Sequence, residues 1–217
     1  MSGGGTGGVT VFIGEQLNHT NAELVYLDFS SASMIIAQRR ARTRILTNII
    51  WIRSWIEGIL YLGIGMFDEL QCSGVLHHLK NPSFGLKVLK DTLTCNGKMG
   101  LMVYAKYGRT GAYHIRKLMR TINSNEVEIE TELKNTNYTL NVLSDRHWFN
   151  VAMHLKHHKE RNVGIYDLLL HKRDVSFYID AVLQWIEMCG LHFVGFYYNK
   201  QRFKLKIQYV FQDAHMK

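Results

Sequence analysis

Apolar and polar positions change period repeatedly along the first hundred residues, so that short buried strands alternate with amphipathic helices. Runs rich in β-branched and aromatic residues predict strands, whereas apolar positions three or four residues apart predict helices. We expect helices over Val9–Leu17, Ser33–Leu46 and Pro82–Thr92, and strands over Glu23–Asp28, Asn48–Arg53, Phe67–Ser73 and Gly97–Tyr104. This order predicts an α/β fold: a Rossmann-like, mostly parallel sheet with helices on both faces.

The pattern changes in the middle of the chain, where helical segments alternate with polar loops between residues 106 and 173. We interpret this stretch as a helical insertion that lies over the ligand crevice as a lid. Alternation resumes with a helix over Phe177–Met188 and a strand over Leu191–Tyr197. The last segment, Arg202–Phe211, is either an antiparallel strand or an exposed edge. We therefore predict one domain over residues 1–217, with the insertion at 106–173.

A glycine-rich loop opens the chain, and Gly3, Gly5 and Gly8 fit the spacing G-x-G-x-x-G. Glycines let a backbone turn tightly and bring its N–H groups against a ligand, although such loops are common. About twenty residues later a predicted strand ends at Asp28, whose carboxylate can accept hydrogen bonds from both hydroxyls of a ribose. The two features together predict a nucleotide-type cofactor. Only two residues precede the loop, so we expect the first strand of the sheet to be missing from the N-terminus.

Composition fits a folded protein, because 47% of the 217 residues are hydrophobic and can build a sizeable core. The apolar stretch Ile56–Phe67 is interrupted and too short to cross a bilayer, so we expect a soluble protein without a membrane partner. The three cysteines, Cys72, Cys95 and Cys189, are widely spaced and odd in number. They indicate reduced thiols in an intracellular, cytoplasmic compartment rather than a disulfide framework.

The net charge of +8 raises the possibility of a nucleic-acid partner. The cationic residues, however, lie opposite apolar positions of predicted helices, as in Arg39, Arg40, Arg42 and Arg44 and again in Arg116, Lys117 and Arg120. Both groups are therefore interpreted as solvated helix faces, and a nucleic-acid partner is not favoured.

The opening glycine loop, the strand that ends at Asp28 and the sequence from Phe67 to Leu79 form three motifs. Together they resemble the class I S-adenosylmethionine-dependent methyltransferases. The opening loop aligns Gly3, Gly5 and Gly7 with the family's acidic-x-G-x-G-x-G motif, with Met1 at the acidic position. Val25–Asp28 is similar to the family's second strand and its acidic residue. The sequence from Phe67 to Leu79, FDELQCSGVLHHL, resembles the fourth motif most specifically. Further similarities at residues 104–111 and 167–174 extend the resemblance over nearly the whole chain.

The resemblance implies transfer of a methyl group from S-adenosylmethionine to an acceptor of unidentified class. It implies that Asp28 holds the ribose, that Phe29 flanks the adenine ring, and that Ser54 and Trp55 lie at the adenine edge. The full set of implied cofactor-binding residues is Gly3, Gly5, Gly7, Asp28, Phe29, Ser54, Trp55 and Ser73. No catalytic residue is assigned, and no metal is expected.

Two other functions remain open at this point. The chain is either the predicted enzyme or an inactive methyltransferase-fold protein that serves as a binding or scaffold module. An NAD-dependent oxidoreductase is less favoured, because the motif ending in Val75–Leu79 is not expected of one.

Three further groups are candidate chemical sites. His77 and His78 are candidates for a base, although we favour a packing role beside the cofactor. His154, His157 and His158 have helical spacing that suits a metal, but their basic neighbours favour a solvated face. Cys72 is expected to be a small buried apolar residue.

Overall fold

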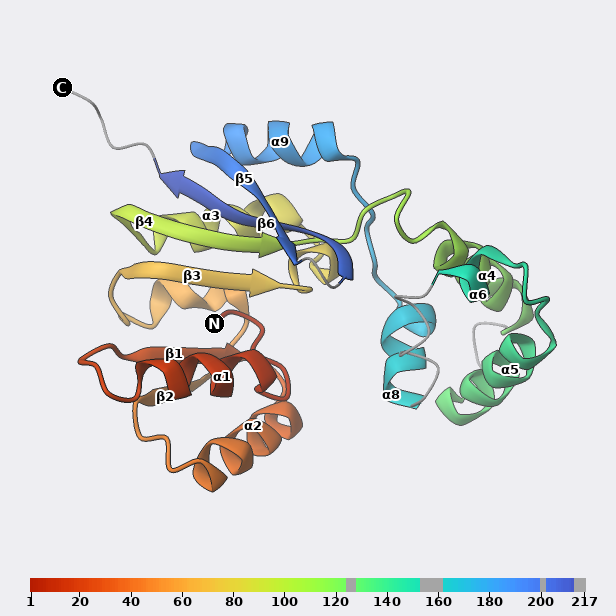
Figure 1. The fold of residues 1–217 in the computed structure, drawn as a ribbon, viewed down its shortest axis with the longest axis horizontal. Coiled ribbons are helices and arrows are strands. Elements are labelled where there is room, and N and C mark those ends of the chain that lie inside the picture. Colours follow the sequence, from red (N-terminus) through yellow and green to blue (C-terminus); the bar gives the residue numbers. More distant parts are fainter. Residues whose placement is uncertain (124–127, 153–161, 200–201, 213–217) are drawn as a thin grey trace. The chain divides into compact units, whose positions relative to one another are not determined.

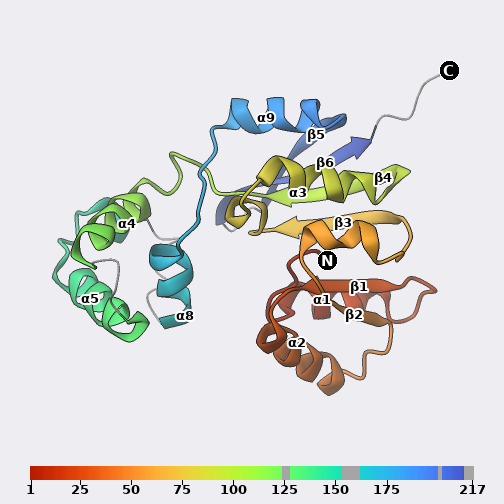
Figure 2. The same cartoon turned by 180° about the vertical axis from the view of Figure 1, so that it is seen from behind.

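The computed structural model describes residues 1–123, 128–152, 162–199 and 202–212, shown from two opposite sides in Figures 1 and 2. The chain divides into two compact units. The first comprises Met1–Val103, Ile179–Tyr198 and Leu205–Lys217, and the second comprises Tyr104–Tyr178 and Asn199–Lys204.

The strands of the first unit form two groups. Strands β1 (Leu24–Asp28) and β2 (Ile49–Arg53) pair in parallel, with Leu24 opposite Ile49 and Asp28 opposite Arg53. The second group has the order β3-β4-β6-β5, and its members are β3 (Phe67–Ser73), β4 (Leu93–Met102), β6 (Arg202–Gln212) and β5 (Leu191–Asn199). β3 and β4 are parallel, whereas β6 runs antiparallel to β4. These pairings confirm the predicted mostly parallel sheet.

Ser2 connects the two groups of strands, because it forms parallel bridges with both Leu27 of β1 and Cys72 of β3. Its N–H donates a hydrogen bond of 2.8 Å to the carbonyl oxygen of Gln71, and the N–H of Leu27 donates one of 2.9 Å to the carbonyl oxygen of Met1. The residues that follow the three bridge partners are Gly3, Asp28 and Ser73. Since parallel strands end at a common edge, this pairing sets those residues at the same edge of the sheet.

Helices cover both faces of the first unit's sheet. α1 (Gly8–Leu17) lies on the face turned toward the viewer in Figure 1, whereas the 3₁₀ helix η1 (Ile56–Tyr61) and α3 (Pro82–Asp91) lie on the face turned toward the viewer in Figure 2. α2 (Ser31–Thr43) packs against α1, β1 and β2. The remaining helices of this unit are η2 (Leu76–His78) and α9 (Ile179–Met188).

Local sequence explains where the two longer connecting helices begin. The hydroxyl of Ser30 accepts a hydrogen bond from the N–H of Ser33 at the start of α2, and the side-chain oxygen of Asn81 accepts one from the N–H of Phe84 at the start of α3. Pro82 follows Asn81 at the first helical position, where its missing N–H costs nothing. Beneath α1 and α2 the side chains form one apolar cluster of Val11, Leu24, Tyr26, Ala37, Ala41 and Ile49.

The second unit is helical. Within its described residues the elements are α4 (Thr110–Ile122), α5 (Ile129–Val142), α6 (Trp148–Val151), α8 (Asn162–Ile165) and the π-helix η4 (Tyr166–Leu170). A separate core holds them together, made of Ala112, Ile115, Met119, Leu140, Phe149, Ile165, Leu168 and Leu169. The predicted insertion at 106–173 falls within this unit, and its role as a lid stays a prediction.

One prediction about charge is wrong. Arg116 does not face solvent: its side chain is 5% exposed and forms an ion pair of 2.9 Å with Asp174, whose side chain is fully buried. The same guanidinium donates to the carbonyl oxygens of Leu168 and His171. Its neighbours on the helix, Lys117 and Arg120, are exposed as predicted. The error arose because the buried partner lies far along the chain, where helical periodicity carries no information.

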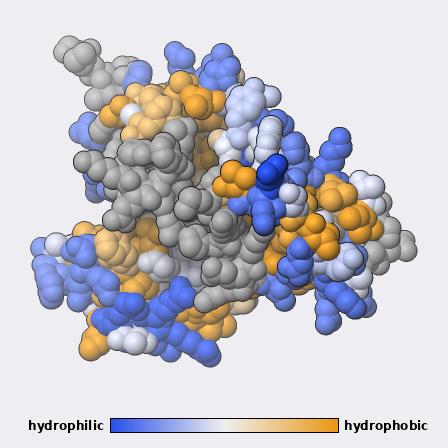
Figure 3. All heavy atoms as spheres, turned by 45° about the vertical axis from the view of Figure 1, so that its right-hand side comes forward, coloured by the Kyte–Doolittle hydropathy of each residue, from blue (hydrophilic) through white to orange (hydrophobic). Residues whose placement is uncertain are grey.

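The basic face of α2 is solvated as predicted. Arg39, Arg40, Arg42 and Arg44 are all exposed, and hydrophilic atoms gather in Figure 3 over the lower part of the molecule, where α2 lies in Figure 1. The final strand, in contrast, is not an edge, because β6 lies between β4 and β5. Among the described residues no helix combines the length and the apolar character that crossing a bilayer requires.

Candidate ligand site at the carboxyl ends of the strands

The glycine-rich loop leads from Ser2 into α1. Gly3, Gly5 and Gly7 have φ values of +67°, +52° and +80°, a region that side chains strongly disfavour. A Cβ atom on Gly7 would lie 2.5 Å from the Cβ of Ala37 in α2. The loop therefore needs glycine at this position for its backbone conformation and for its packing against α2.

Asp28 ends β1 beneath this loop, and only 8% of the residue is exposed. One carboxylate oxygen, Oδ2, accepts a hydrogen bond of 2.7 Å from the N–H of Gly5, and Oδ1 accepts one of 2.8 Å from the N–H of Ser30. A carboxylate offers about four lone-pair sites, so these two bonds orient the group without exhausting it. Asp28 thus remains able to accept hydrogen bonds from a ligand at the edge of the sheet.

Two exposed aromatic rings lie beside Asp28. Phe29 and Trp55 stack with ring centroids 4.5 Å apart and planes 8° apart, and they are 55% and 62% exposed. The backbone brings them together, because the N–H of Ser54 donates a hydrogen bond to the carbonyl oxygen of Asp28. The hydroxyl of Ser54 donates to the carbonyl oxygen of Trp55. The ends of β1 and β2 therefore present an apolar, aromatic surface next to a buried carboxylate.

The end of β3 also contributes to this edge, beside the glycine-rich loop, Asp28 and the stacked aromatic rings. Ser73 is followed by Gly74, which has a φ of +79° and donates a hydrogen bond to the carbonyl oxygen of Met102. The next residue, Val75, packs so closely on the glycine-rich loop that a Cβ on Gly3 would lie 2.1 Å from its Cγ2 atom. The structure therefore brings all the sequence-predicted cofactor residues to one edge of the first unit.

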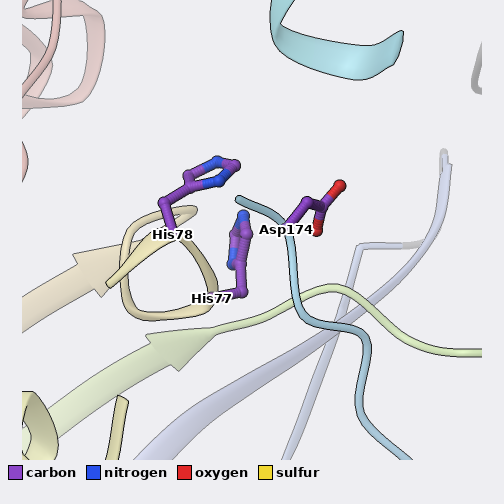
Figure 4. Close-up of side chains that lie close together, drawn as sticks. All are labelled: His77, His78 and Asp174. Carbon is purple, nitrogen blue, oxygen red and sulfur yellow. The ribbon is translucent and has the colours of Figure 1, made fainter. Parts of the chain in front are cut away.

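His77 and His78 follow on η2, directly after β3, with ring centroids 4.1 Å apart (Figure 4). His77 is fully buried and His78 is half-buried. Burial of His77 agrees with the packing role favoured from the sequence, whereas a catalytic role for either ring stays untested. The predicted His154, His157 and His158 cluster lies outside the described residues.

Cys72 behaves as predicted. The residue is fully buried, and burial raises the pKa of its thiol to about 12. A thiol with such a pKa is not a nucleophile at ordinary pH. Cys72 is therefore a packing residue between Ser2 and the core.

Sequence reasoning missed two residues that contact the loop, Tyr26 and Arg40. The hydroxyl of Tyr26 donates a hydrogen bond of 2.7 Å to the carbonyl oxygen of Gly5, and a Cβ on Gly4 would lie 2.2 Å from the ring of Tyr26. The guanidinium of Arg40 in α2 donates to the carbonyl oxygen and to the hydroxyl of Thr6, at 2.9 and 3.1 Å. A signal existed for Tyr26, because a residue two positions before Asp28 shares its face of the strand.

A groove of about 790 Å³ in the first unit lies elsewhere, at the beginnings of β1 and β3. Its lining includes Leu24, Val25, Phe67 and Glu69, and none of the predicted cofactor residues. Ligands of parallel α/β sheets bind at the carboxyl ends of the strands. For this reason the edge with Asp28, rather than this groove, is the candidate ligand site.

Residues 2–99 match the family described as "Methyltransferase domain". The matched range contains all the residues of the candidate site: the glycine-rich loop, Asp28, the two stacked rings, Ser54 and Ser73. The resemblance inferred from the sequence motifs is thereby confirmed for this part of the chain.

Solved structures share the fold of the methyltransferase domain. PKMT2 from Rickettsia typhi, in complex with AdoHcy, has a TM-score of 0.62 and 15% identity, covering 93% of this chain and 41% of its own. The structure of LepI in complex with SAM has a TM-score of 0.53 and 9% identity, covering 96% and 40% of the two chains. At these identities the likeness concerns the fold.

A curated relative matches in sequence as well. An uncharacterized protein from Synechococcus sp. (strain ATCC 27144 / PCC 6301 / SAUG 1402/1) is 28% identical over 205 residues, covering 90% of this chain and 47% of its own length. The chain thus spans about half the length of the curated relative that it matches.

Proposed function

We propose that this methyltransferase domain binds S-adenosylmethionine at the edge formed by the glycine-rich loop, Asp28 and the stacked pair Phe29–Trp55, and takes part in transfer of its methyl group to an acceptor. The observation that carries the proposal is the Asp28 carboxylate, which two backbone N–H groups orient and leave with spare acceptor capacity. The matched family and the AdoHcy and SAM complexes of the fold relatives support it.

The residues present fit such a cofactor. A Cβ atom on Gly5 or Gly8 would meet no atom within 4 Å, so the loop borders open space that a ligand can fill. Asp28 would accept hydrogen bonds from the two ribose hydroxyls, and the exposed ring of Phe29 would flank the adenine. Ser54 and Trp55 would border the adenine edge, and Ser73 would close the site from β3.

The cofactor itself supplies the activated group, a methyl carried on a positively charged sulfur. The chain's contribution is to hold the donor in one orientation, which removes part of the entropic barrier to reaction. No described side chain is assigned as a base, and the acceptor remains an unassigned substrate class. The proposal consequently concerns the donor site.

Isothermal titration with S-adenosylmethionine and S-adenosylhomocysteine tests the proposal on the chain and on Asp28→Asn. The substitution preserves shape but removes the charge and one acceptor, so we expect affinity to fall at least about tenfold, which corresponds to about 1.4 kcal/mol. Asp145→Asn, at an exposed aspartate of the second unit, is the matched control and should bind as the parent does.

Two results would overturn the proposal. One is the absence of saturable binding by the parent chain at millimolar S-adenosylmethionine. The other is enhanced NADH fluorescence on mixing with the chain, without binding of S-adenosylmethionine, which would favour the oxidoreductase alternative.

A further inference from the structure

A single residue of the glycine-rich loop is held at both of its backbone polar groups by β1. The N–H of Gly5 donates to Oδ2 of Asp28 at 2.7 Å, and its carbonyl oxygen accepts from the hydroxyl of Tyr26 at 2.7 Å. Tyr26 and Asp28 are two residues apart in a strand, so both side chains project from the same face. Side chains on one face of β1 therefore form hydrogen bonds with both the N–H and the carbonyl oxygen of Gly5.

The hydroxyl of Tyr26 has a defined position because its ring is fully enclosed. The residue is 0% exposed, and its ring packs against Trp51 with centroids 4.8 Å apart. Burial, together with the nearby charge of Asp28, raises the pKa of Tyr26, so the hydroxyl keeps its proton and remains a donor. The phenol is thus a fixed donor beneath the loop.

Gly4 is part of the same arrangement. A Cβ atom there would lie 2.2 and 2.4 Å from two carbons of the Tyr26 ring. The backbone conformation of Gly4 makes no demand for glycine, since its φ is not among the positive values. Glycine is required at position 4 because the large aromatic ring of Tyr26 lies under the loop. The alternating pattern of Gly3, Gly5 and Gly7 does not explain this requirement.

We propose that Tyr26 is a positioning residue of the cofactor site: its hydroxyl fixes the Gly5 carbonyl and so keeps the loop in its ligand-binding conformation before the ligand arrives. This inference rests on the proposed function for its ligand. Gly5 has a φ of +52°, and its side toward open space is where the cofactor would lie. A loop ordered in advance loses less conformational entropy on binding, so affinity depends on the hydroxyl without contact between it and the ligand.

Tyr26→Phe removes the hydroxyl and keeps the ring that supports Gly4 and Trp51. Two measurements are made: amide hydrogen exchange of Gly5 without ligand, followed by NMR, and the Kd for S-adenosylmethionine. We expect exchange of the Gly5 amide to be about three- to tenfold faster and the Kd to be about three- to tenfold higher, the usual range for losing one hydrogen bond. Amides of β3 should exchange as in the parent.

Tyr138→Phe is the matched control, because Tyr138 lies on α5 of the second unit and is 71% exposed. It should change neither measurement. Gly4→Ala provides a second variant that reaches the same hydrogen bond from the loop, by pushing the ring of Tyr26 away. It should also speed exchange at Gly5, and this keeps the proposal testable if Tyr26→Phe does not fold.

The outcomes separate the two proposals. If Tyr26→Phe leaves both the exchange of Gly5 and the Kd unchanged, Tyr26 does not position the loop, even though the donor site stands. If the parent chain does not bind S-adenosylmethionine, the proposed function fails, and with it the cofactor named in this inference. Unchanged exchange at Gly5 in both variants would overturn the loop mechanism whatever the ligand.

Discussion

Two buried aspartates, one in each unit, are stabilised in different ways. Asp28 in the first unit accepts hydrogen bonds from two backbone N–H groups, those of Gly5 and Ser30. The side chain of Asp174 in the second unit is fully buried and pairs with the guanidinium of Arg116 at 2.9 Å. The first carboxylate is oriented by neutral donors, and the second has its charge balanced by a cation.

This difference distinguishes the Asp28 carboxylate, which can bind a ligand, from the Asp174 carboxylate, which connects two segments of the chain. Neutral N–H donors leave the charge of Asp28 in place at the edge of the sheet, where a ligand can use it. The Arg116–Asp174 pair instead joins α4 to the segment that leaves the helical unit, while the same guanidinium also bonds the carbonyl oxygens of Leu168 and His171. A buried carboxylate is therefore not, by itself, a sign of a binding site.

The largest expected effect comes from breaking the ion pair. Arg116→Met leaves the Asp174 carboxylate buried without its cation, and we expect the free energy of unfolding to fall by about 3–5 kcal/mol. Urea denaturation followed by circular dichroism measures it. Arg120→Met, at an exposed position of the same helix, is the control and should change stability by less than about 0.5 kcal/mol.

A double variant sharpens this test. Arg116→Met combined with Asp174→Leu removes both charges and should recover most of the loss, because an apolar pair of similar volume often replaces a buried ion pair without cost. A single Arg116→Met variant as stable as the parent would show that the pair does not hold the helical unit together.

Asp28→Asn should have the opposite balance of effects. The amide oxygen of the asparagine can accept from only one of the two N–H groups, and its NH2 group cannot accept from the other. We therefore expect a stability loss of only about 1–2 kcal/mol, against the tenfold loss of cofactor affinity described above. Arg116→Met, in contrast, should bind S-adenosylmethionine as the parent does. An equal loss of affinity in both variants, measured by isothermal titration, would contradict the distinction between the two aspartates.

Two glycines of the loop offer a finer contrast. Gly7→Ala places a Cβ atom 2.5 Å from Ala37 in addition to its strained φ, and we expect a loss of about 2–3 kcal/mol in the free energy of unfolding. Gly5→Ala meets no atom within 4 Å, so only the backbone strain of about 1–2 kcal/mol applies. Equal losses in thermal denaturation would contradict the packing of Gly7 on α2.

The smallest effect concerns alkaline pH. Burial, followed by the charge of Asp174, raises the pKa of Tyr113 in the second unit to about 12. The unfolded chain ionises its tyrosines near pH 10, so the stability contribution of Tyr113 is complete below that pH and is lost as pH rises toward 12. Tyr113→Phe should therefore lose less stability than the parent between pH 9 and pH 11 in urea denaturation. An identical loss in both proteins would contradict the assignment.

The sequence was sufficient for much of the first unit, because its signals are local. Strand and helix periods located β1, β2, β3, α1, α2 and α3, and Asp28 could be placed at a strand end from its position in the pattern. Glycine in left-handed conformations likewise reflects a demand of the backbone itself, and alignment with the family's glycine motif identified Gly3, Gly5 and Gly7. The resemblance to methyltransferase motifs then connected these features to one cofactor.

Contacts between distant segments were decided only by the tertiary structure. Periodicity shows which face of an element is buried but not which side chain packs against that face. The pattern therefore predicted that Arg116 is solvated, whereas the structure pairs it with Asp174. For the same reason the sequence did not show Tyr26 beneath Gly4 and Gly5, or β6 inserted between β4 and β5. The chain's local chemistry fixed the elements and the carboxylate, whereas long-range packing fixed the partners that hold them in place.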